Sequence, residues 1–536
     1  RPCDGSSAPQ GGGVFNRGYL MLKGEELQQL QTAAREDMHK IINDRRTLVD
    51  EKLRQAVGYV LSTERKVGSF FTYADDDNCY HFDAPTQTLR KLLSTTRIHP
   101  NFGALLYQRY GLPYTKAFTR DVVAGLEAAA RSKPGAKIKR FSSFDQDNGV
   151  LYLSRYNGTC YKLDGKTISI VPNGSDGVLF ADDDGGVPCD ADLAVTDPVV
   201  VRNALVADLE YTTKTAGGLT KESQQLLFEC WLYMVGFDVR TKPILILVGD
   251  KGSGKTFSIE RLQQVVIGRA RPVAIARKST DTDLFVTLLH HPLALFDNVD
   301  SYIDWLPDAI ASYATGGESS KRTLFTNSDQ STIKPKAYMA VTTRNPVSFY
   351  RDDVADRLVI LRLKRRSEFG DDDRLLSGVE ADRHRVFGAW LQTANRILSA
   401  YHAERETTFT SKYRLAGFTR FVAVAGKVLG YTENQITDAL KQLQEERNEF
   451  TVENEPFLEI LLQYLKEFPT RDNRALTPNA WFEILNGYAA IHGLTWSFKT
   501  PATLAMHIHN KLDGLKRRVT VEIYEENGKP SYAFSI

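Results

Sequence analysis

The sequence contains few cysteines and no long hydrophobic run. Only five cysteines occur among 536 residues, and no two of them stand in a C-x-x-C pair. The sequence therefore indicates neither a disulfide framework nor a cysteine-bound zinc site, and it favours a reducing, intracellular location. No apolar run approaches the ~18 residues that a membrane-spanning helix needs. Residues 1–14 lack the apolar centre of a signal peptide and read as a linker or a trimmed end, so we expect no membrane association.

A large net charge is also missing. The chain has 68 Lys and Arg residues against 66 Asp and Glu residues, which gives a formal net charge of +2. No global basic field therefore marks a nucleic-acid-binding protein, and any such site must be local, for instance a pore or one helix face. With 42% hydrophobic and 25% charged residues, the composition is that of a globular protein. The length corresponds to about three or four domains.

Changes in sequence pattern divide the chain into five segments, and the predicted fold class is multidomain α/β. Apolar residues recur at three- and four-residue steps over Leu20–Lys66, which predicts one or two helices. From Phe70 to Ala194, short β-type runs and turn clusters surround a helical stretch, Asp121–Arg131, which indicates a small α/β module. A further helix is predicted over Asp208–Trp231. The predicted segments are a linker with a helical part (1–66), the small α/β module (67–198), a core of alternating strands and helices (199–372), a helical lid or connector (373–452) and a C-terminal domain (453–536).

The small module contains one acidic cluster whose composition admits a metal site. The residues Asp75–Asp77 precede Cys79 and His81 in the chain. No second ligand cluster stands at a convincing spacing, so the pattern favours a solvated turn over a metal site.

The most specific motif is the glycine-rich turn Gly249–Thr256. It follows a buried-strand pattern, Lys242–Val248, and precedes a helix pattern, Phe257–Ile267, which is the context that a G-x-x-x-x-G-K-[ST] phosphate-binding loop requires. Glycines allow backbone N–H groups to point inward, and the helix start adds partial positive charge. We expect Lys255 to reach the β- and γ-phosphates of ATP and the Thr256 hydroxyl to ligate Mg²⁺. The candidate nucleotide-binding residues are Gly249, Gly252, Ser253, Gly254, Lys255, Thr256 and Phe257.

A second acidic strand end downstream supplies the other expected Mg²⁺ ligand. Four apolar residues, Leu293–Phe296, lead into Asp297, which we interpret as the Walker-B acid. Many P-loop ATPases place Glu next to polarise the attacking water, but here Asn298 follows. Either Asp300 takes the role of the base or Asn298 orients the water, and the sequence leaves both alternatives open.

A third strand pattern, Ala337–Thr343, ends at Asn345, which is the candidate for positioning water between the two Walker strands. Two arginines follow, Arg351 and Arg357, and the second stands just before another apolar strand. An arginine there reaches the γ-phosphate of a neighbouring subunit, and we favour Arg357 as this arginine finger. The alternative is a local ion pair with Asp352, Asp353 or Asp356. A finger supplied by a neighbour predicts a ring.

The stretch from Ala314 to Pro346 resembles the AAA+ helicase module of phage and plasmid primase-helicases, the poxvirus-type group related to superfamily 3 helicases. The shared features are a Thr-Gly-Gly turn, Arg322, a polar segment with Lys-Pro-Lys, the strand, and an Asn-Pro pair. The module upstream of the core also looks like the segment that precedes the motor in bacterial members. The resemblance covers Phe70 to Arg366 and is strongest over residues 249–357.

This resemblance implies a P-loop AAA+ core that assembles into a hexamer and acts as a DNA helicase on single-stranded or forked DNA, beside a primase or polymerase. The cell would be a bacterium or a virus-infected cell, with the protein in its cytoplasm. The hairpin of such rings lines the pore, which here corresponds to Leu324–Lys336 with Lys334 and Lys336 on the DNA phosphates. Two lysines that flank a proline in a polar loop suit backbone contact, although a solvated surface loop is the alternative. No catalytic primase constellation is visible.

The C-terminal segment predicts three helices and a β-hairpin. The helices are expected over Glu455–Phe468, Thr477–His492 and Thr500–Leu512, and the hairpin strands over Arg518–Tyr524 and Pro530–Ile536. This combination resembles a winged helix. Positive side chains on or beside the third helix are then candidate DNA contacts, namely Lys511, Lys516 and Arg517. Contact with other proteins alone is the alternative.

Three functions agree with these motifs. The first is a replicative helicase of a phage, plasmid or other mobile element. The second is a ring ATPase that remodels or loads replication proteins without unwinding DNA. The third is an ATP-gated DNA-binding switch, such as an origin-binding or defence protein.

Overall fold

The computed structural model describes residues 22–536 apart from short stretches. These stretches are 23, 74–77, 95–96, 133–134, 182–184, 274, 276–277, 318, 323–329, 334–336, 369–371, 454–455, 470–474, 495, 497, 517 and 527–528. The acidic cluster Asp75–Asp77 therefore lies outside the described residues. Among those that are described, no group of His, Cys, Asp and Glu side chains is arranged to hold a metal ion. None of the described helices combines the length and the hydropathy needed to cross a membrane.

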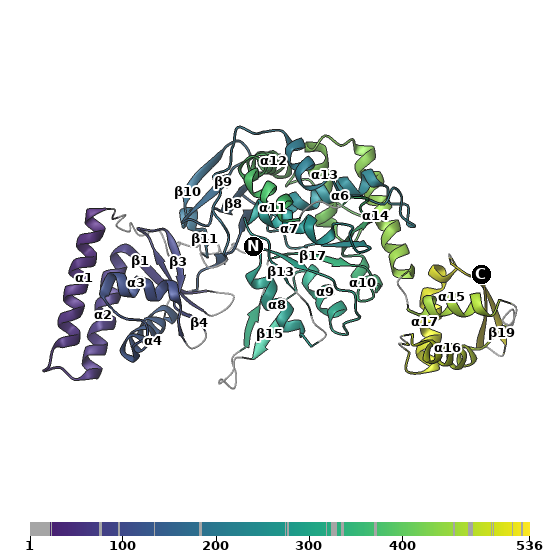
Figure 1. Ribbon diagram of the computed structural model, residues 1–536, viewed down its shortest axis with the longest axis horizontal. Coiled ribbons are helices and arrows are strands. Elements are labelled where there is room, and N and C mark those ends of the chain that lie inside the picture. The colour runs from purple at the N-terminus through teal and green to yellow at the C-terminus, as the bar shows by residue number, and fades with distance from the viewer. Residues whose placement is uncertain are drawn as a thin grey trace, which may run out of the picture.

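The N-terminal part consists of four helices packed around a small antiparallel sheet (Figure 1, purple and blue). The first two helices confirm the helical prediction for the start of the chain, and their residues Met38 and Val60 are fully buried in one core with Leu106 and Val123. The helices are α1 (Glu25–Asn43), α2 (Val49–Val67), α3 (Pro100–Tyr110) and α4 (Ala117–Arg131). The strands are β1 (Gly68–Thr72), β2 (Cys79–Asp83) and β3 (Thr88–Lys91), with the short pair β4 (Leu93–Ser94) and β5 (Arg97–Ile98) beside them.

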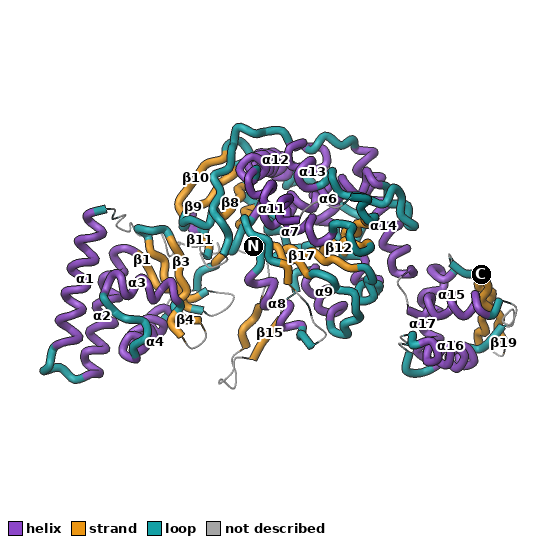
Figure 2. Tube along the Cα trace, in the orientation of Figure 1, coloured by secondary structure: helices purple, strands orange, loops and turns teal. Residues whose placement is uncertain are grey.

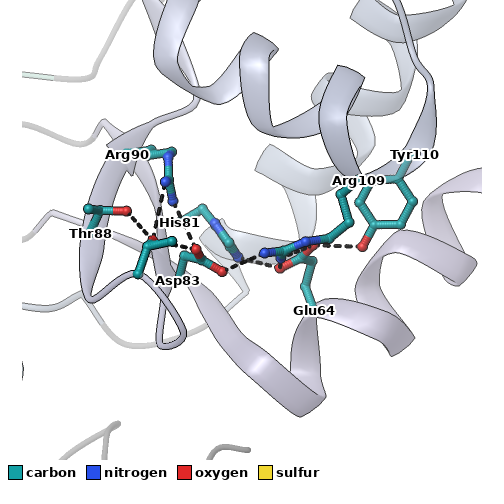
Figure 3. Close-up of polar contacts among 8 residues, drawn as sticks. Glu64, His81, Asp83, Thr88, Arg90, Arg109 and Tyr110 are labelled. Carbon is teal, nitrogen blue, oxygen red and sulfur yellow. Dashed lines mark hydrogen bonds and ion pairs between the residues drawn. The ribbon is translucent and has the colours of Figure 1, made fainter. Parts of the chain in front are cut away.

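A network of charged side chains is sealed inside this N-terminal part (Figure 3). Arg109 of α3 donates hydrogen bonds to both carboxylate oxygens of Glu64 at 2.8 and 2.7 Å, and to Asp83 at 2.9 Å. Tyr110 donates to Glu64 at 2.6 Å, and His81 Nε2 lies 2.8 Å from the same carboxylate. We call these five residues the buried network. It joins α2, β2 and α3, and the contact of His81 with Glu64 places His81 inside it.

A second antiparallel sheet, in the order β10-β9-β8-β7, packs against the central part of the chain. Tyr161 of β9 meets Phe387 edge to face, and Leu151 and Leu153 of β8 lie in the same core as Trp390. The predicted 67–198 module thus contributes to several hydrophobic cores and not to a single one. The strands are β7 (Ser142–Asp145), β8 (Val150–Ser154), β9 (Thr159–Leu163) and β10 (Ile168–Pro172), with the parallel pair β6 (Ile138–Lys139) and β11 (Leu179–Phe180) and the 3-10 turn η1 (Ser175–Gly177) nearby.

The central part is built on a five-stranded parallel sheet in the order β13-β14-β17-β12-β18. Its strands are continuous apolar runs because both faces are covered: Leu245 and Leu247 of β12 face one core, whereas Ile244 and Ile246 face the other. The strands are β12 (Ile244–Gly249), β13 (Pro272–Val273), β14 (Leu293–Phe296), β17 (Tyr338–Thr343) and β18 (Leu358–Leu363). The helices are α5 (Pro198–Leu205), α6 (Lys221–Met234), α7 (Lys255–Val266), α8 (Asp281–His290), α9 (Leu306–Ala314) and α10 (Asp352–Ala355).

The helix predicted over Asp208–Trp231 is wrong at its start. Helix α6 begins only at Lys221, after Thr220 caps it by accepting a hydrogen bond from the Ser223 N–H. Gly218 has a φ of +90° and breaks the helical pattern in the preceding turns. Residues 206–219 are thereby free to reach the end of β18, where Thr212 N–H bonds to Arg362 O.

A bundle of helices follows the sheet, over the segment 373–452 that the sequence predicts to be helical (Figure 2). Trp390 stacks on Tyr233 of α6 with the ring centroids 5.9 Å apart, which ties this bundle to the central part. The helices are α11 (Asp372–Ala381), α12 (Arg383–Ala403), α13 (Ala416–Val428) and α14 (Glu433–Glu453).

The C-terminal part has a core of its own around Trp481, Leu485 and Phe534. The three predicted helices and the hairpin are confirmed, and Trp481 Nε1 donates to Tyr532 O at 2.8 Å, which locks the second helix to the hairpin. The elements are α15 (Pro456–Glu467), α16 (Pro478–His492), α17 (Pro501–Leu515), β19 (Thr520–Glu526) and β20 (Lys529–Ser535).

Candidate functional site

Three strands of the parallel sheet end at one edge, and the polar residues that follow them lie together. Strand β17 lies between β12 and β14, as predicted. Thr256, in the first turn of α7, donates a 2.6 Å hydrogen bond to Oδ1 of Asp297, which directly follows β14. The two residues predicted to hold Mg²⁺ are thus in contact although they stand 41 positions apart in the chain.

The turn between β12 and α7 folds around the ammonium group of Lys255. Gly252 and Gly254 have φ angles of +81° and +77°, in the left-handed region that favours glycine. Lys255 Nζ donates hydrogen bonds to the backbone oxygens of Gly249 at 2.6 Å and Asp250 at 2.9 Å. Burial lowers the pKa of Lys255 below its ordinary value. The turn therefore gathers one cation and the first N–H groups of α7, an arrangement suited to phosphate binding.

The other two predicted residues of the turn are buried. Ser253 donates from Oγ to Asp250 O at 2.9 Å and so supports the turn from inside. Phe257 is 9% exposed, and the guanidinium of Arg261 lies over its ring at 5.0 Å. The Phe257 side chain therefore packs beside the turn, and Arg261, one helical turn further along α7, holds it in place.

Asp297 is positioned by Thr342, a residue that the sequence did not single out. Thr342 Oγ1 donates to Asp297 Oδ1 at 2.5 Å and accepts a 3.0 Å hydrogen bond from the Asn298 backbone. Asn298 Nδ2 donates to Asp297 Oδ2 at 2.8 Å, and Asn298 has a φ of +55°, which is strained for a residue with a side chain. Asn298 thus acts on the carboxylate in this structure. Position 342 stands inside a strand, so only the strand order reveals its role.

Asp300 is bound by the last residue of β17 and by the residue that follows it. Its Oδ1 accepts from the Arg344 backbone N–H at 2.6 Å and from Thr343 Oγ1 at 3.1 Å, and its Oδ2 accepts from Arg344 Nε at 2.9 Å. Burial opposes ionisation, but these hydrogen bonds outweigh it and hold the pKa of Asp300 below its ordinary value. A carboxylate so engaged is a weak proton acceptor, which counts against the alternative that Asp300 is the base.

Asn345 lies exposed at the end of β17, next to Arg344. The two candidate finger arginines, Arg351 and Arg357, do not contact the turn among the described residues, and both lie near acidic residues of their own chain. Arg351 bonds to Asp353 at 3.0 and 2.9 Å and to Asp308 at 2.6 Å.

Arg357 is only 6% exposed, and its Nη1 lies 4.0 Å from Asp353. Burial lowers its pKa, and its Nε and Nη1 have no hydrogen-bond partner among the described residues. The structure does not bring Arg351 or Arg357 together with the turn. Their role at a neighbouring subunit remains a prediction.

A further charged group, which sequence reasoning missed, lies against the opposite side of α7. Arg261 donates to both carboxylate oxygens of Asp208 at 2.7 and 2.6 Å. Arg366, which follows β18, donates to the same carboxylate at 3.3 Å. The three residues come from segments about 50 to 160 positions apart, so no local motif signals them.

Only some of the residues predicted to contact DNA lie in the described part of the chain. Strands β15 (Ser319–Arg322) and β16 (Gln330–Ile333) form the predicted hairpin, but their pairing begins at Ser319, five residues before the predicted start at Leu324. Lys334, Lys336 and Arg517 lie outside the described residues. Lys516 is exposed, whereas Lys511 forms an ion pair with Asp352 of α10.

Comparison with known proteins finds one family whose model matches part of the chain. Residues 220–439 match the family described as actinomycete integrative conjugative element replication protein. No curated protein matches the chain. Two solved structures of the NrS-1 C-terminal region share 11% and 12% sequence identity with it, each at a TM-score of 0.36, covering 90% of this chain and 98% of the other. A third, apo structure of that region has 11% identity and a TM-score of 0.37 at the same coverage. These TM-scores are too low to establish a shared fold.

Proposed function

We propose that the chain hydrolyses ATP at the turn between β12 and α7 and uses the energy to move single-stranded DNA in the replication of a mobile element. The observation that carries this proposal is the contact of Thr256 with Asp297 beside the Lys255 turn. It supplies a phosphate cradle, a cation and two oxygen ligands at one sheet edge. The match of residues 220–439 to a family of replication proteins supports the role in replication.

The oxygen donors at this edge fit Mg²⁺. A threonine hydroxyl and a carboxylate are hard oxygen ligands of the kind that Mg²⁺ takes, and a bound Mg²⁺ would neutralise charge on the phosphates. Thr342 and Asn298 hold the Asp297 carboxylate in place. We assign the orientation of the attacking water to Asn298 and the exposed Asn345, because Asp300 is already occupied by Arg344.

In this proposal, the parallel sheet is the core of an AAA+ ATPase, the helices α11–α14 are its lid, and the C-terminal part is a winged helix. The chains form a ring, as a hexamer, in which Arg357 of one subunit completes the site of the next. Two donor groups of the buried Arg357 make no hydrogen bond within the described part of the chain, which is costly, and an incoming phosphate would supply the missing acceptor.

The ring is tested by mixing two inactive variants. Lys255→Ala removes the phosphate cation and Arg357→Ala removes the finger, so a mixed ring contains some complete interfaces. We expect ATP hydrolysis to reappear on mixing, at protein concentrations that allow assembly. If no mixing ratio restores hydrolysis, Arg357 acts within its own chain or no ring forms.

A second candidate function is an ATPase that remodels or loads other replication proteins, or an ATP-gated DNA-binding switch. Two ion pairs favour it. Lys511 pairs with Asp352 and Arg518 pairs with Glu449, so basic residues of the C-terminal part contact the central part and the bundle. A domain whose basic residues pair with acidic residues of its own chain is suited to contact with proteins as well as with DNA.

Strand displacement on a forked duplex separates these functions. We expect unwinding that depends on ATP, and we expect Lys334→Ala combined with Lys336→Ala to abolish it while basal ATP hydrolysis persists. The double variant should also flatten the plot of log affinity for single strands against log salt, since each lost phosphate contact contributes a slope of about 0.7. Hydrolysis that DNA stimulates without any unwinding would favour the remodeller, and slow turnover with tight nucleotide binding would favour the switch.

A further inference from the structure

The charged group on the far side of α7 consists of Asp208, Arg261 and Arg366, and it touches the phosphate turn directly. On helix α7, positions 257 and 261 share one face, whereas position 256 points to a different face. Thr256 therefore turns toward Asp297, whereas Arg261 turns toward Asp208 and lies over the ring of Phe257, as their contacts show. The turn is consequently flanked on one side by the expected Mg²⁺ ligands and on the other by this charged group.

Arg366 is attached to the turn at two points. Its backbone N–H donates to Gly252 O at 3.1 Å. Its guanidinium lies so close to Gly254 that a Cβ built on that glycine would stand 3.0 Å from Arg366 Nε. Because Gly254 has no side chain, the Arg366 guanidinium can lie against the backbone of the turn. It is a second cation there, beside Lys255.

The hydrogen bonds in this group are unequal. Asp208 holds Arg261 through two bonds of 2.6 and 2.7 Å, the two-pronged geometry of a strong carboxylate–guanidinium pair. Arg366 reaches Asp208 only through 3.3 Å contacts from Nη2, and its Nε is buried with no hydrogen-bond partner among the described residues. One carboxylate thus faces two guanidinium groups, and Arg366 is the weakly held one.

We propose that Arg366 is a phosphate ligand of the nucleotide site, kept next to the turn by Asp208 until a nucleotide binds. When a nucleotide binds, the guanidinium of Arg366 donates hydrogen bonds to the phosphate oxygens, and the Asp208 carboxylate stays bonded to Arg261. This inference rests on the proposed function, because it requires that the turn binds a nucleotide. Arg366 also stands a few residues before α11, which packs against α7. Engagement of Arg366 therefore couples the phosphates to the start of the helical bundle.

Equilibrium binding of nucleotides by the full chain tests this role. The variant is Arg366→Gln, and the matched control is Arg365→Gln, which removes the same charge from the adjacent, exposed position. We expect Arg366→Gln to weaken the binding of ATP and of ADP by roughly 10- to 100-fold, the usual effect of losing a hydrogen bond to a charged group. The control should stay within about threefold of the wild type on the same scale.

Adenosine, measured by competition against a fluorescent ADP analogue, separates a phosphate ligand from a structural residue. Its affinity should be unchanged in Arg366→Gln, because it carries no phosphate. Equal losses for ATP, ADP and adenosine would assign Arg366 a structural role and overturn the inference. ATP binding within threefold of the wild type would overturn it too. If Arg366→Gln does not fold, Arg366→Lys, which keeps the charge but loses the planar fork, is compared in the same series and should lose ATP affinity selectively. A wild-type chain that binds no ATP would instead contradict the proposed function itself.

Discussion

The buried network and the charged residues around the phosphate turn use the same residue types in opposite ways. In the network, Glu64, Asp83 and Arg109 are exposed by 1% or less, and the two carboxylates are bonded to the central guanidinium. Around the turn, the side chains of Asp208 and Arg344 are 41% and 56% exposed. A sealed network fixes one geometry, whereas a more exposed group with unequal bonds can exchange a partner for a ligand.

The cost of removing one partner of an ion pair follows from this difference in exposure. Removing one partner from a buried pair leaves an uncompensated charge in a medium that solvates it poorly, whereas an exposed pair is weak because water replaces either partner. The buried network should therefore determine the stability of the N-terminal part. Substitutions around the turn should mainly affect ligand binding and turnover.

The largest expected effect is in the buried network. Arg109→Met leaves Glu64 and Asp83 without their shared cation and should destabilise the N-terminal part by about 3–5 kcal/mol. Hydrogen exchange of α2 and β2, followed by mass spectrometry, measures this. The control is Lys40→Met, which breaks an exposed pair with Asp37 and should leave exchange in both elements unchanged. An Arg109→Met chain with wild-type protection would show that the network does not hold these elements together.

The pH dependence of the same elements gives the next largest effect. Burial opposes ionisation of Glu64, but the neighbouring His81 and Arg109 and the bond from Tyr110 outweigh it and lower the pKa of Glu64 to about 2 from 4.5. Because the folded pKa lies below the unfolded one, the stabilisation is fully present above pH 4.5 and is lost as the pH falls toward 2. Its size is on the order of 3 kcal/mol.

The Glu64→Gln variant lacks the titrating carboxyl group, so comparing it with the wild type tests whether Glu64 causes the pH dependence. The wild type should lose protection of α2 progressively as the pH falls from about 4.5 toward 2, after correction for intrinsic exchange rates, as expected for a group with a depressed pKa. The variant should be less stable at neutral pH, but its stability should change less over that window. Parallel pH profiles for the two chains would contradict the assignment of the effect to Glu64.

A smaller effect is predicted for Thr342 of β17, beside the turn. Thr342→Val removes the hydroxyl that orients Asp297 and should lower kcat for ATP about tenfold, equal to about 1.4 kcal/mol, with little change in KM. Thr342→Ser retains the hydroxyl and should keep most of the activity. Equal kcat values for the valine and serine variants would mean that Thr342 does not position the carboxylate.

Local patterns predicted the elements well, whereas contacts between distant segments escaped prediction. The strand, turn and helix around Lys255 are contiguous in sequence, so glycine spacing and periodicity were sufficient. Thr342 and Arg344 act on residues more than 40 positions away, and their roles follow from the strand order alone. The helix expected from Asp208 fails for the same reason. Composition favours a helix there, but Gly218 and the contact with β18 determine a turn.

The buried network shows the same limit. His81 stood near an acidic cluster and a cysteine, which gave the pattern of a metal site, whereas its partner Glu64 lies in a helix that begins far upstream. Helix α3, which carries Arg109, was not predicted, because its pattern of apolar residues is weak. A salt-bridge network assembled from α2, β2 and α3 leaves no spacing signature, since each charged residue is separately typical of a protein surface.

Hydrolysis of ATP by Lys255→Ala and Lys251→Ala chains tests the central claim most directly. Both variants remove one lysine from the same turn, but Lys255 points inward to the backbone oxygens of Gly249 and Asp250, whereas Lys251 is exposed. With Mg²⁺ present and both chains folded, we predict that Lys255→Ala lowers kcat by about 10³-fold or more, comparable to the loss of an arginine finger. Lys251→Ala should stay within about threefold of the wild type, as expected for an exposed charge. Near-normal hydrolysis by a folded Lys255→Ala chain would contradict the assignment of ATP hydrolysis to this turn.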